Sequence, residues 1–260
     1  MKRFFEYIGL SLIILFSFYY TERVALLVRN NNPLMQNIRN VAPNTGVEPV
    51  NARIIDDTII PGINGEVVNI NKSYRRMRSF GVFNEYYLVF DVLSPEISLK
   101  ANKEKIIVSG NRAKRAVSLV IDNNQDIKNF LIANNIDATM ISYLNSYELL
   151  ELEQINGEHD RNKFKNMESI LNRNGKNVNI CLIKNSNKDI CLRNRKYLVK
   201  ESLTLNGSNL ALIRSNVESG SIILVTSSAR VEDINILIRQ IRYQGLRIIP
   251  LSQLISEEKN

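Results

Sequence analysis

The stretch from Lys114 to Asn124, KRAVSLVIDNN, limits what this 260-residue chain can fold into more than any other. A short apolar run ends in Asp122, two asparagines follow, and a helical pattern begins at Asp126. This order is typical of a buried parallel strand that turns at its carboxyl end into an amphipathic helix. Asp122 is therefore expected at the edge where α/β sheets build their sites. The plain alternative is that Asp122 or Asn123 only caps the next helix.

Strand and helix patterns alternate along the rest of the chain. Strands are expected at 116–121, 136–141, 178–183, 197–199, 202–205, 219–225 and 245–249. Helices are expected at 126–134, 146–155, 166–174, 209–219 and 231–243. Repeated βα units of this kind favour an α/β class with a parallel sheet or barrel.

Three segments resemble polysaccharide deacetylases of the NodB homology family. Val117 to Asn124 is similar to the V-A-L-T-F-D-D-G strand that opens the family's catalytic domain, and Ile136 to Ile141 is similar to its V-x-A-T-F-F strand. Ser219 to Leu254 follows the family's last strand, helix and G-Y-K-F-V-T-L-S-E-L segment. The resemblance covers residues 112 to 256 and implies an incomplete (β/α) barrel.

The resemblance also assigns roles, and most of the assigned positions lack the required side chain. In the family, a divalent metal such as Zn activates water for amide hydrolysis, and an Asp acts as the base. Asp122 holds the position of that base. The metal-binding Asp is replaced by Asn123, whose neutral amide is a weaker ligand. The two histidine ligands are replaced by Lys163 and Met167, and the late acid histidine by Thr226.

The chain contains one histidine, His159, so the missing histidine pair cannot be supplied from elsewhere. We therefore expect a deacetylase-like domain that has kept the fold and lost the reaction, with Asp122 vestigial and no bound cofactor. The alternative is an active N-deacetylase with an unusual site built from Asp122 and His159.

Positive charge is concentrated between Arg161 and Lys200. This segment holds eleven Lys and Arg against Glu168 and Asp189, so it carries +9, whereas the whole chain carries +8. A local basic surface attracts polyanions. The candidate polyanion-binding residues are Arg161, Lys163, Lys165, Arg193, Arg195 and Lys196. A solvated face without a partner is the alternative interpretation.

The N-terminus predicts a membrane anchor. Residues 7–20 contain no charge and follow Met1-Lys2-Arg3, and no A-x-A-like cleavage site comes after them. An uncleaved single-pass anchor over residues 1–28 is favoured. The positive-inside bias is slight because Arg23 and Arg29 follow the apolar core. The family resemblance favours an extracytoplasmic C-terminal part.

The remaining organisation follows from local patterns. A linker is expected at 29–52, a small β-rich α+β module at 53–110, and the deacetylase-like domain at 111–260. Cys181 falls in a predicted strand and Cys191 in a predicted helix. Two buried free thiols are favoured over a disulfide, which an oxidising compartment would allow.

Together these features favour a membrane-anchored cell-envelope protein that binds cell-wall glycan or an anionic wall polymer. Nucleic acid is not expected as a partner of an exported domain. It becomes the partner in the alternative where the basic segment faces the cytoplasm. The ligand and the oligomeric state stay open.

Overall fold

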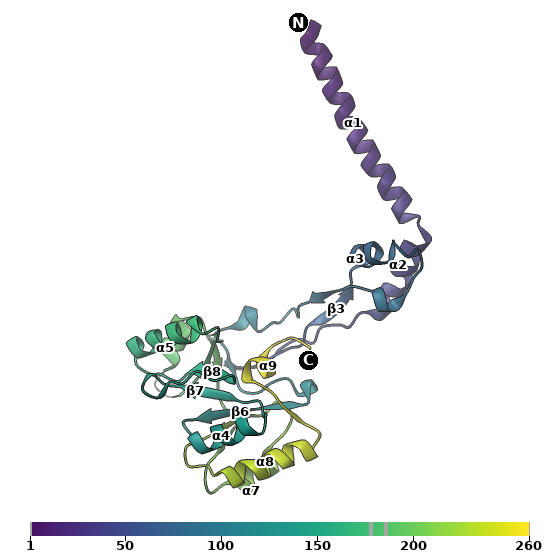
Figure 1. The fold of residues 1–260 in the computed structure, drawn as a ribbon. Coiled ribbons are helices and arrows are strands. Elements are labelled where there is room, and N and C mark those ends of the chain that lie inside the picture. The colour runs from purple at the N-terminus through teal and green to yellow at the C-terminus, as the bar shows by residue number, and fades with distance from the viewer. Residues whose placement is uncertain (1, 177–178, 185–186, 260) are drawn as a thin grey trace. The chain divides into compact units, whose positions relative to one another are not determined.

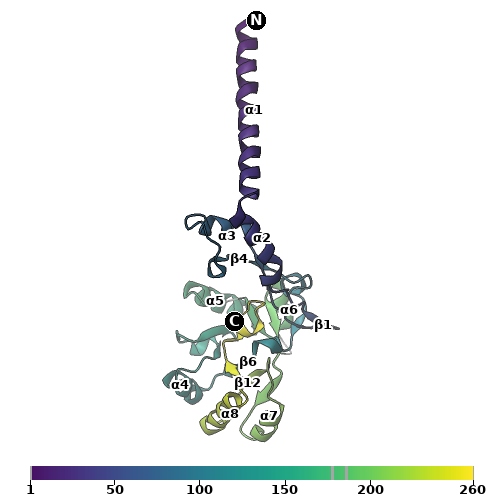
Figure 2. The ribbon, with the colours of Figure 1, turned by 90° about the vertical axis from the view of Figure 1, so that its right-hand side faces the viewer.

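The computed structural model describes residues 2–176, 179–184 and 187–259, and its chain trace is drawn in Figures 1 and 2. The chain divides into two compact units. Unit 1 comprises Met1–Glu48 and Gly65–Leu93, and unit 2 comprises Pro49–Asn64 and Ser94–Asn260.

Unit 1 begins with the long helix α1 (Lys2–Asn30). Its segment Gly9–Asn30 has a mean hydropathy of 1.5 and is not buried against the rest of the protein. At 1.5 Å per residue these 22 residues extend about 33 Å, which matches a hydrocarbon layer of about 30 Å. By length and composition, α1 is able to cross a membrane.

The rest of unit 1 is a small α/β body with its own core. It contains α2 (Pro33–Thr45), β3 (Gly65–Val68), α3 (Ile70–Met77), the 3₁₀ turn η1 (Glu85–Tyr87) and β4 (Phe90–Leu93). Asn32 caps α2 by accepting from the Leu34 amide, and Pro33 occupies the first helical position. Strands β3 and β4 form an antiparallel pair. The core is made of Leu34, Met35, Ile38, Val68, Tyr74, Met77 and Leu88.

This division differs from the module expected at 53–110. Helix α2 from the expected linker belongs to unit 1, whereas β1 (Arg53–Ile55), β2 (Thr58–Ile60) and β5 (Ile106–Ile107) belong to unit 2. The cause is strand pairing. β5 pairs in parallel with β10 (Tyr197–Val199), a strand about ninety residues further along the chain. Local sequence patterns do not reveal such distant partners.

Unit 2 is an α/β structure in which nearly every strand pair is parallel. Its further strands are β6 (Ala116–Asp122), β7 (Thr139–Ser142), β8 (Glu153–Asn156), β9 (Ile180–Leu182), β11 (Leu203–Leu205), β12 (Ile222–Val225) and β13 (Arg247–Ile248). Its helices are α4 (Gln125–Ala133), α5 (Arg161–Arg173), α6 (Lys188–Arg193), α7 (Leu210–Asn216), α8 (Val231–Tyr243) and α9 (Leu251–Ile255). Three 3₁₀ turns complete it: η2 (Lys100–Asn102), η3 (Arg112–Lys114) and η4 (Leu144–Ser146).

The strands form two sheets. One has the order β11-β12-β6-β7-β8, with β13 paired to β6, and the other has the order β1-β2-β5-β10-β9. Only the β1–β2 hairpin is antiparallel among the described pairs of unit 2. Strands β6, β7 and β8 therefore end at a common edge, and Figure 1 shows them side by side.

The strand β6 separates two apolar cores because its side chains alternate. Val117, Leu119 and Ile121 pack outward against residues of α4, α7 and α8. Ala116 and Val120 pack inward, in a core that receives residues from both sheets and from α9. Figure 2 shows α4, α8 and α7 along β6 and β12. The predicted α/β class requires helices on the outside of the strands. Unit 2 has this arrangement, with an inner core that both sheets share.

Helices α5 and α6 cover the outer face of β9 and β10. Phe164 of α5, Cys181 of β9, Cys191 of α6 and Leu198 of β10 form one buried cluster. Within it, Cys181 and Cys191 form a disulfide. The prediction of two free thiols was wrong, because the neighbouring helix places Cys191 directly over the strand that carries Cys181.

The helix expected at 146–155 is also absent. The chain there forms η4 and then β8, which pairs with β7 and buries Ile155 in the inner core. The side-chain amide of Gln154 donates to the Glu148 carbonyl at 2.8 Å and to the Ser142 hydroxyl at 3.0 Å. The apolar pattern of LLELEQI fits both a short helix and a strand. Pairing with β7 selects the strand here.

The disulfide gives a first prediction. It closes a loop with a sequence separation of ten residues, so it restricts the unfolded chain. Replacing both cysteines by alanine is expected to lower the free energy of unfolding by about 2–3 kcal/mol in chemical denaturation. The denatured, unreduced protein should contain no titratable thiol. Two thiols per chain would contradict the disulfide.

Candidate functional site

A group of polar side chains follows the carboxyl ends of four strands. Asp122 ends β6, Tyr143 follows β7, His159 follows β8, and Lys184 follows β9. The first three strands are parallel neighbours in one sheet, so their carboxyl ends lie at the edge where α/β proteins build their sites, whereas β9 belongs to the other sheet. Hydrogen bonds and electrostatic interactions connect the four side chains, as described below.

The Asp122 carboxylate is held by two donors. The Tyr143 hydroxyl donates to Oδ1 at 2.8 Å, and the Lys184 ammonium donates to Oδ2 at 2.8 Å. Lys184 Nζ also lies 3.4 Å from the Tyr143 hydroxyl. The Asp122 side chain is 23% exposed and that of Lys184 is 34% exposed, so the ion pair is partly withdrawn from water. A half-buried carboxylate is thus neutralised by a lysine of this chain.

The turn after Asp122 explains why its carboxylate is free to make these contacts. Asn123 takes a left-handed conformation with a φ of 47°, which asparagine tolerates better than most residues. Asn124 then caps α4, with its Oδ1 accepting from the Ile127 amide at 3.0 Å. The helix cap is therefore Asn124, and the alternative that Asp122 or Asn123 serves only as a cap was wrong.

Tyr143 is fixed by the strand beside it. A Cβ atom at Gly157 would lie 2.7 Å from the Tyr143 ring and 2.3 Å from Ile141 Cγ2. Only glycine allows the ring to lie this close to the backbone after β8. Burial, together with the hydrogen bond to Asp122, raises the pKa of the Tyr143 phenol well above its ordinary value. Tyr143 is therefore a neutral donor toward Asp122 at physiological pH.

His159 lies next to this ion pair. Its Nδ1 is buried and has no hydrogen-bond partner among the described residues. Burial lowers the pKa of His159, and the positive charge of Lys184 lowers it further, against the opposing charges of Glu158 and Asp122. Glu158 is buried and accepts from the Leu144 amide at 2.7 Å. The imidazole is accordingly neutral near pH 7.

The residues at the family's other catalytic positions have no polar contact with Asp122 in the described part of the chain. Asn123 is exposed, Lys163 is exposed in the first turn of α5, and Met167 is fully buried in the same helix. The Met167 side chain packs in the core, and the Lys163 side chain lies on the exposed face of α5.

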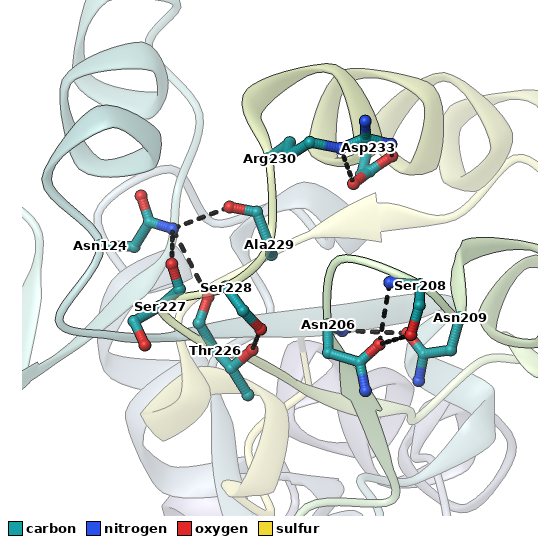
Figure 3. Close-up of polar contacts among 10 residues, drawn as sticks. All are labelled: Asn124, Asn206, Ser208, Asn209, Thr226, Ser227, Ser228, Ala229, Arg230 and Asp233. Atoms are coloured by element: carbon teal, nitrogen blue, oxygen red, sulfur yellow. Dashed lines mark hydrogen bonds and ion pairs between the residues drawn. The ribbon is translucent and has the colours of Figure 1, made fainter.

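Thr226, at the position of the late histidine, takes part in a separate polar network (Figure 3). Its hydroxyl donates to the Leu205 carbonyl at 3.1 Å and lies 2.9 Å from the Ser228 hydroxyl. The Asn124 amide donates to the carbonyls of Ser227 and Ala229, which ties the turn after β6 to the turn after β12. These contacts stabilise the loops at this edge.

The side chains at the edge do not suit a divalent metal. Among residues 2–176, 179–184 and 187–259, no three His, Cys, Asp or Glu side chains are grouped as metal ligands. Asp122 is paired with an ammonium group, which competes with a metal ion for the carboxylate. We therefore derive no metal-dependent step for this chain.

The basic residues singled out in the sequence lie on and next to α5 and α6. Arg161, Lys163 and Lys165 are exposed on α5, and Arg193 and Arg195 are exposed at the end of α6. Lys196 differs from them. It is 7% exposed and forms an ion pair with Glu168, so it belongs to the protein interior and not to a ligand-binding surface.

Comparison with known proteins defines the class of the fold. The crystal structure of BA3943 from Bacillus anthracis, described as a CE4 family pseudoenzyme, superposes with a TM-score of 0.57 at 17% identity, over 87% of this chain and 96% of that one. A BA3943 mutant described as having restored enzymatic activity gives a TM-score of 0.59 at 18% identity, over 87% and 99% of the two chains. The chain has the α/β fold of these CE4 polysaccharide deacetylase-like proteins, which confirms the resemblance at the level of the fold.

Sequence similarity to a curated protein covers a smaller part of the chain than the structural similarity does. The uncharacterized protein YlxY of Bacillus subtilis (strain 168) is 36% identical over 96 residues, which are 36% of this chain and 30% of that protein. The match thus spans less than a third of that relative's length. No family model matches the sequence.

Sequence reasoning found Asp122 and His159 but missed Tyr143, Glu158 and Lys184. Tyr143 and Lys184 follow the carboxyl ends of strands, so the rule that pointed to Asp122 applies to them equally. The partner of Asp122 was concealed because Lys184 is 62 residues away in sequence. Glu158 was hidden by the erroneous helix at 146–155, which removed the strand that it follows.

The single histidine makes the electrostatics of this edge measurable. Replacing Lys184 by methionine removes a positive charge beside the imidazole, so the pKa of His159 is expected to rise toward its ordinary value. Asp122→Asn removes a negative charge beside the imidazole, so it should lower the pKa of His159 further. The readout is the pH titration of the one imidazole signal in NMR spectra.

Lys105→Met is the matched control for this titration, because Lys105 pairs with Asp57 and donates to the Asp56 carbonyl, away from His159. It should leave the imidazole titration unchanged. A titration curve that is the same in Lys184→Met and in the unmodified protein would show that Lys184 does not lie against this site.

Proposed function

We propose that this protein is a non-catalytic, membrane-anchored member of the cell envelope whose deacetylase-like domain binds an anionic cell-wall polymer or glycan. The ion pair between Lys184 and Asp122 carries the first half of the proposal. A general base must be available to take a proton from an activated water molecule. Here the carboxylate of the candidate base Asp122 is occupied by the Lys184 ammonium at 2.8 Å and the Tyr143 phenol at 2.8 Å.

The location in the envelope rests on two observations. Helix α1 is apolar and long enough to span a membrane. The disulfide between Cys181 and Cys191 is a bond that persists in oxidising compartments and is rare in the cytosol. The helix supports membrane anchoring, and the disulfide supports an extracytoplasmic unit 2. The description of BA3943 as a pseudoenzyme is in keeping with a domain of this fold that lacks catalysis.

The ligand follows from the basic surface of α5 and α6. Both helices pack on β9 and β10, because Phe164 and Cys191 belong to one buried cluster with residues of these strands. Their exposed cations therefore lie on the two helices that cover this pair of strands. Outside a membrane, the polyanions available to such a region are anionic polymers and glycans of the wall. Lys196 is left out of the binding surface, since its ammonium is paired with Glu168.

The lack of catalysis is tested by acetate release from N-acetylated glycan. The protein is expected to release no acetate above background, with or without added Zn²⁺, and Asp122→Asn should behave identically. The charge of Asp122 affects the pKa of His159. The competing hypothesis is therefore an active N-deacetylase whose site is built from Asp122 and His159. Release that Asp122→Asn or His159→Ala abolishes would establish that hypothesis and overturn ours.

The binding surface is tested by sedimentation with purified cell walls. The charge reversals Arg161→Glu, Lys165→Glu and Arg193→Glu are expected to weaken binding at least tenfold at low salt, with a smaller difference at high salt. A control with the same net charge reverses the exposed residues Arg214, Arg239 and Arg242 on α7 and α8. An equal loss of cell-wall binding in both variants would show that binding depends only on net charge, and it would contradict a binding surface on α5 and α6.

A further inference from the structure

A second basic feature lies at the opposite end of β6 from Asp122. A cavity of about 350 Å³ is lined by seven residues, of which four are cations and none is acidic. The cations are Lys114, Arg115, Arg247 and Lys259. The first two precede β6 and Arg247 begins β13, so the cavity lies at the amino ends of these strands.

Backbone pairing brings the two arginines together. The Arg247 amide donates to the Arg115 carbonyl at 3.0 Å, and its guanidinium donates to the Lys114 carbonyl at 3.3 Å. Arg115 has a φ of 49°, a left-handed conformation that arginine seldom adopts. This left-handed residue ends the 3₁₀ turn η3, with its backbone amide donating to the Arg112 carbonyl, which fixes the point where the chain enters β6. A Cβ atom at Gly245 would lie 3.2 Å from the Arg115 guanidinium, so this arm of the cavity lies against a glycine.

The four cations around this cavity have no direct ion-pair partner among the described residues. Lys114 is 5% exposed, and its ammonium donates to the Gln253 carbonyl and, at 2.9 Å, to the Ser256 hydroxyl. Burial lowers the pKa of Lys114 to about 8; the negative charges of Glu258 and Glu257 oppose this effect, and the positive charge of Arg247 adds to it. Four mutually repelling cations around one cavity would be stabilised by a bound anion.

We propose that this cavity is an anion site for a phosphate group. The guanidinium groups of Arg115 and Arg247 have the fork geometry that matches phosphate oxygens. The ammonium groups of Lys259 and Lys114 add positive charge, and that of Lys114 keeps its hydrogen bonds to the Gln253 carbonyl and the Ser256 hydroxyl. A phosphate offers more oxygen acceptors than a carboxylate, which suits a site with this many donors. The site is independent of the α5 and α6 surface, so either proposal can fail without the other.

Isothermal titration of the full-length protein in neutral detergent micelles with inorganic phosphate tests the site. Saturable one-to-one binding is expected, and Arg115→Gln with Arg247→Gln should weaken it at least tenfold. A second arm uses glycerophosphoglycerol, a soluble phosphodiester. Tighter binding of the diester would identify a polymer-borne phosphate as the ligand, and tighter binding of inorganic phosphate would identify a free one.

Two further variants keep this test decisive. Lys259→Gln changes an exposed residue outside the strands that has no ion pair with a described acidic residue, and it should still weaken phosphate binding several-fold. Arg239→Gln with Arg242→Gln removes the same charge from α8 and should leave binding unchanged. The proposal is overturned if millimolar phosphate gives no saturable binding, or if the α8 variant loses as much affinity as the Arg115 and Arg247 variant.

Discussion

The strand β6 is the constraint on which the rest of unit 2 depends. Its two faces supply two different cores, with Val117, Leu119 and Ile121 outward and Ala116 and Val120 inward. Because side chains alternate with a period of two, a slip of one residue would exchange the cores and place Ser118 against the outer helices. The register of β6 is therefore fixed along its whole length by burial. The position of Asp122 at its end is a consequence of that packing.

The edge built this way lies at the carboxyl ends of parallel strands, where α/β folds build their sites. There an ammonium group neutralises the Asp122 carboxylate. An ion pair of this kind satisfies a half-buried charge and cannot lower the pKa of a bound water as a divalent cation does. The tyrosine and the neutral imidazole complete a polar site suited to donating and accepting hydrogen bonds.

The sequence predicted those elements whose pattern is local and long. The helix expected at 231–243 is observed with the same bounds, because VEDINILIRQIRY buries an unambiguous apolar face and begins with two acids. The strand containing Asp122 was equally clear. The short segment at 146–155 was not, since its apolar residues fit two periods and only pairing with β7 selects the strand.

What sequence reasoning missed depends on contacts between distant segments. The pairing of β5 with β10 moves part of the expected module into unit 2, and the packing of α6 on β9 joins two cysteines that had been predicted free. Lys196 was assigned to a binding surface from its charge alone, whereas burial and Glu168 place it inside. Lys184 was counted only as part of a basic segment, although its ammonium is the direct partner of Asp122.

The central claim is that Lys184 occupies the carboxylate that a metal would need. The most direct measurement is isothermal titration of Zn²⁺ into the full-length protein and into Asp122→Asn, with chelator-treated samples. We expect no stoichiometric Zn²⁺ binding by the unmodified protein and no difference between it and Asp122→Asn. One equivalent of Zn²⁺ bound at micromolar affinity, and lost in Asp122→Asn, would contradict it.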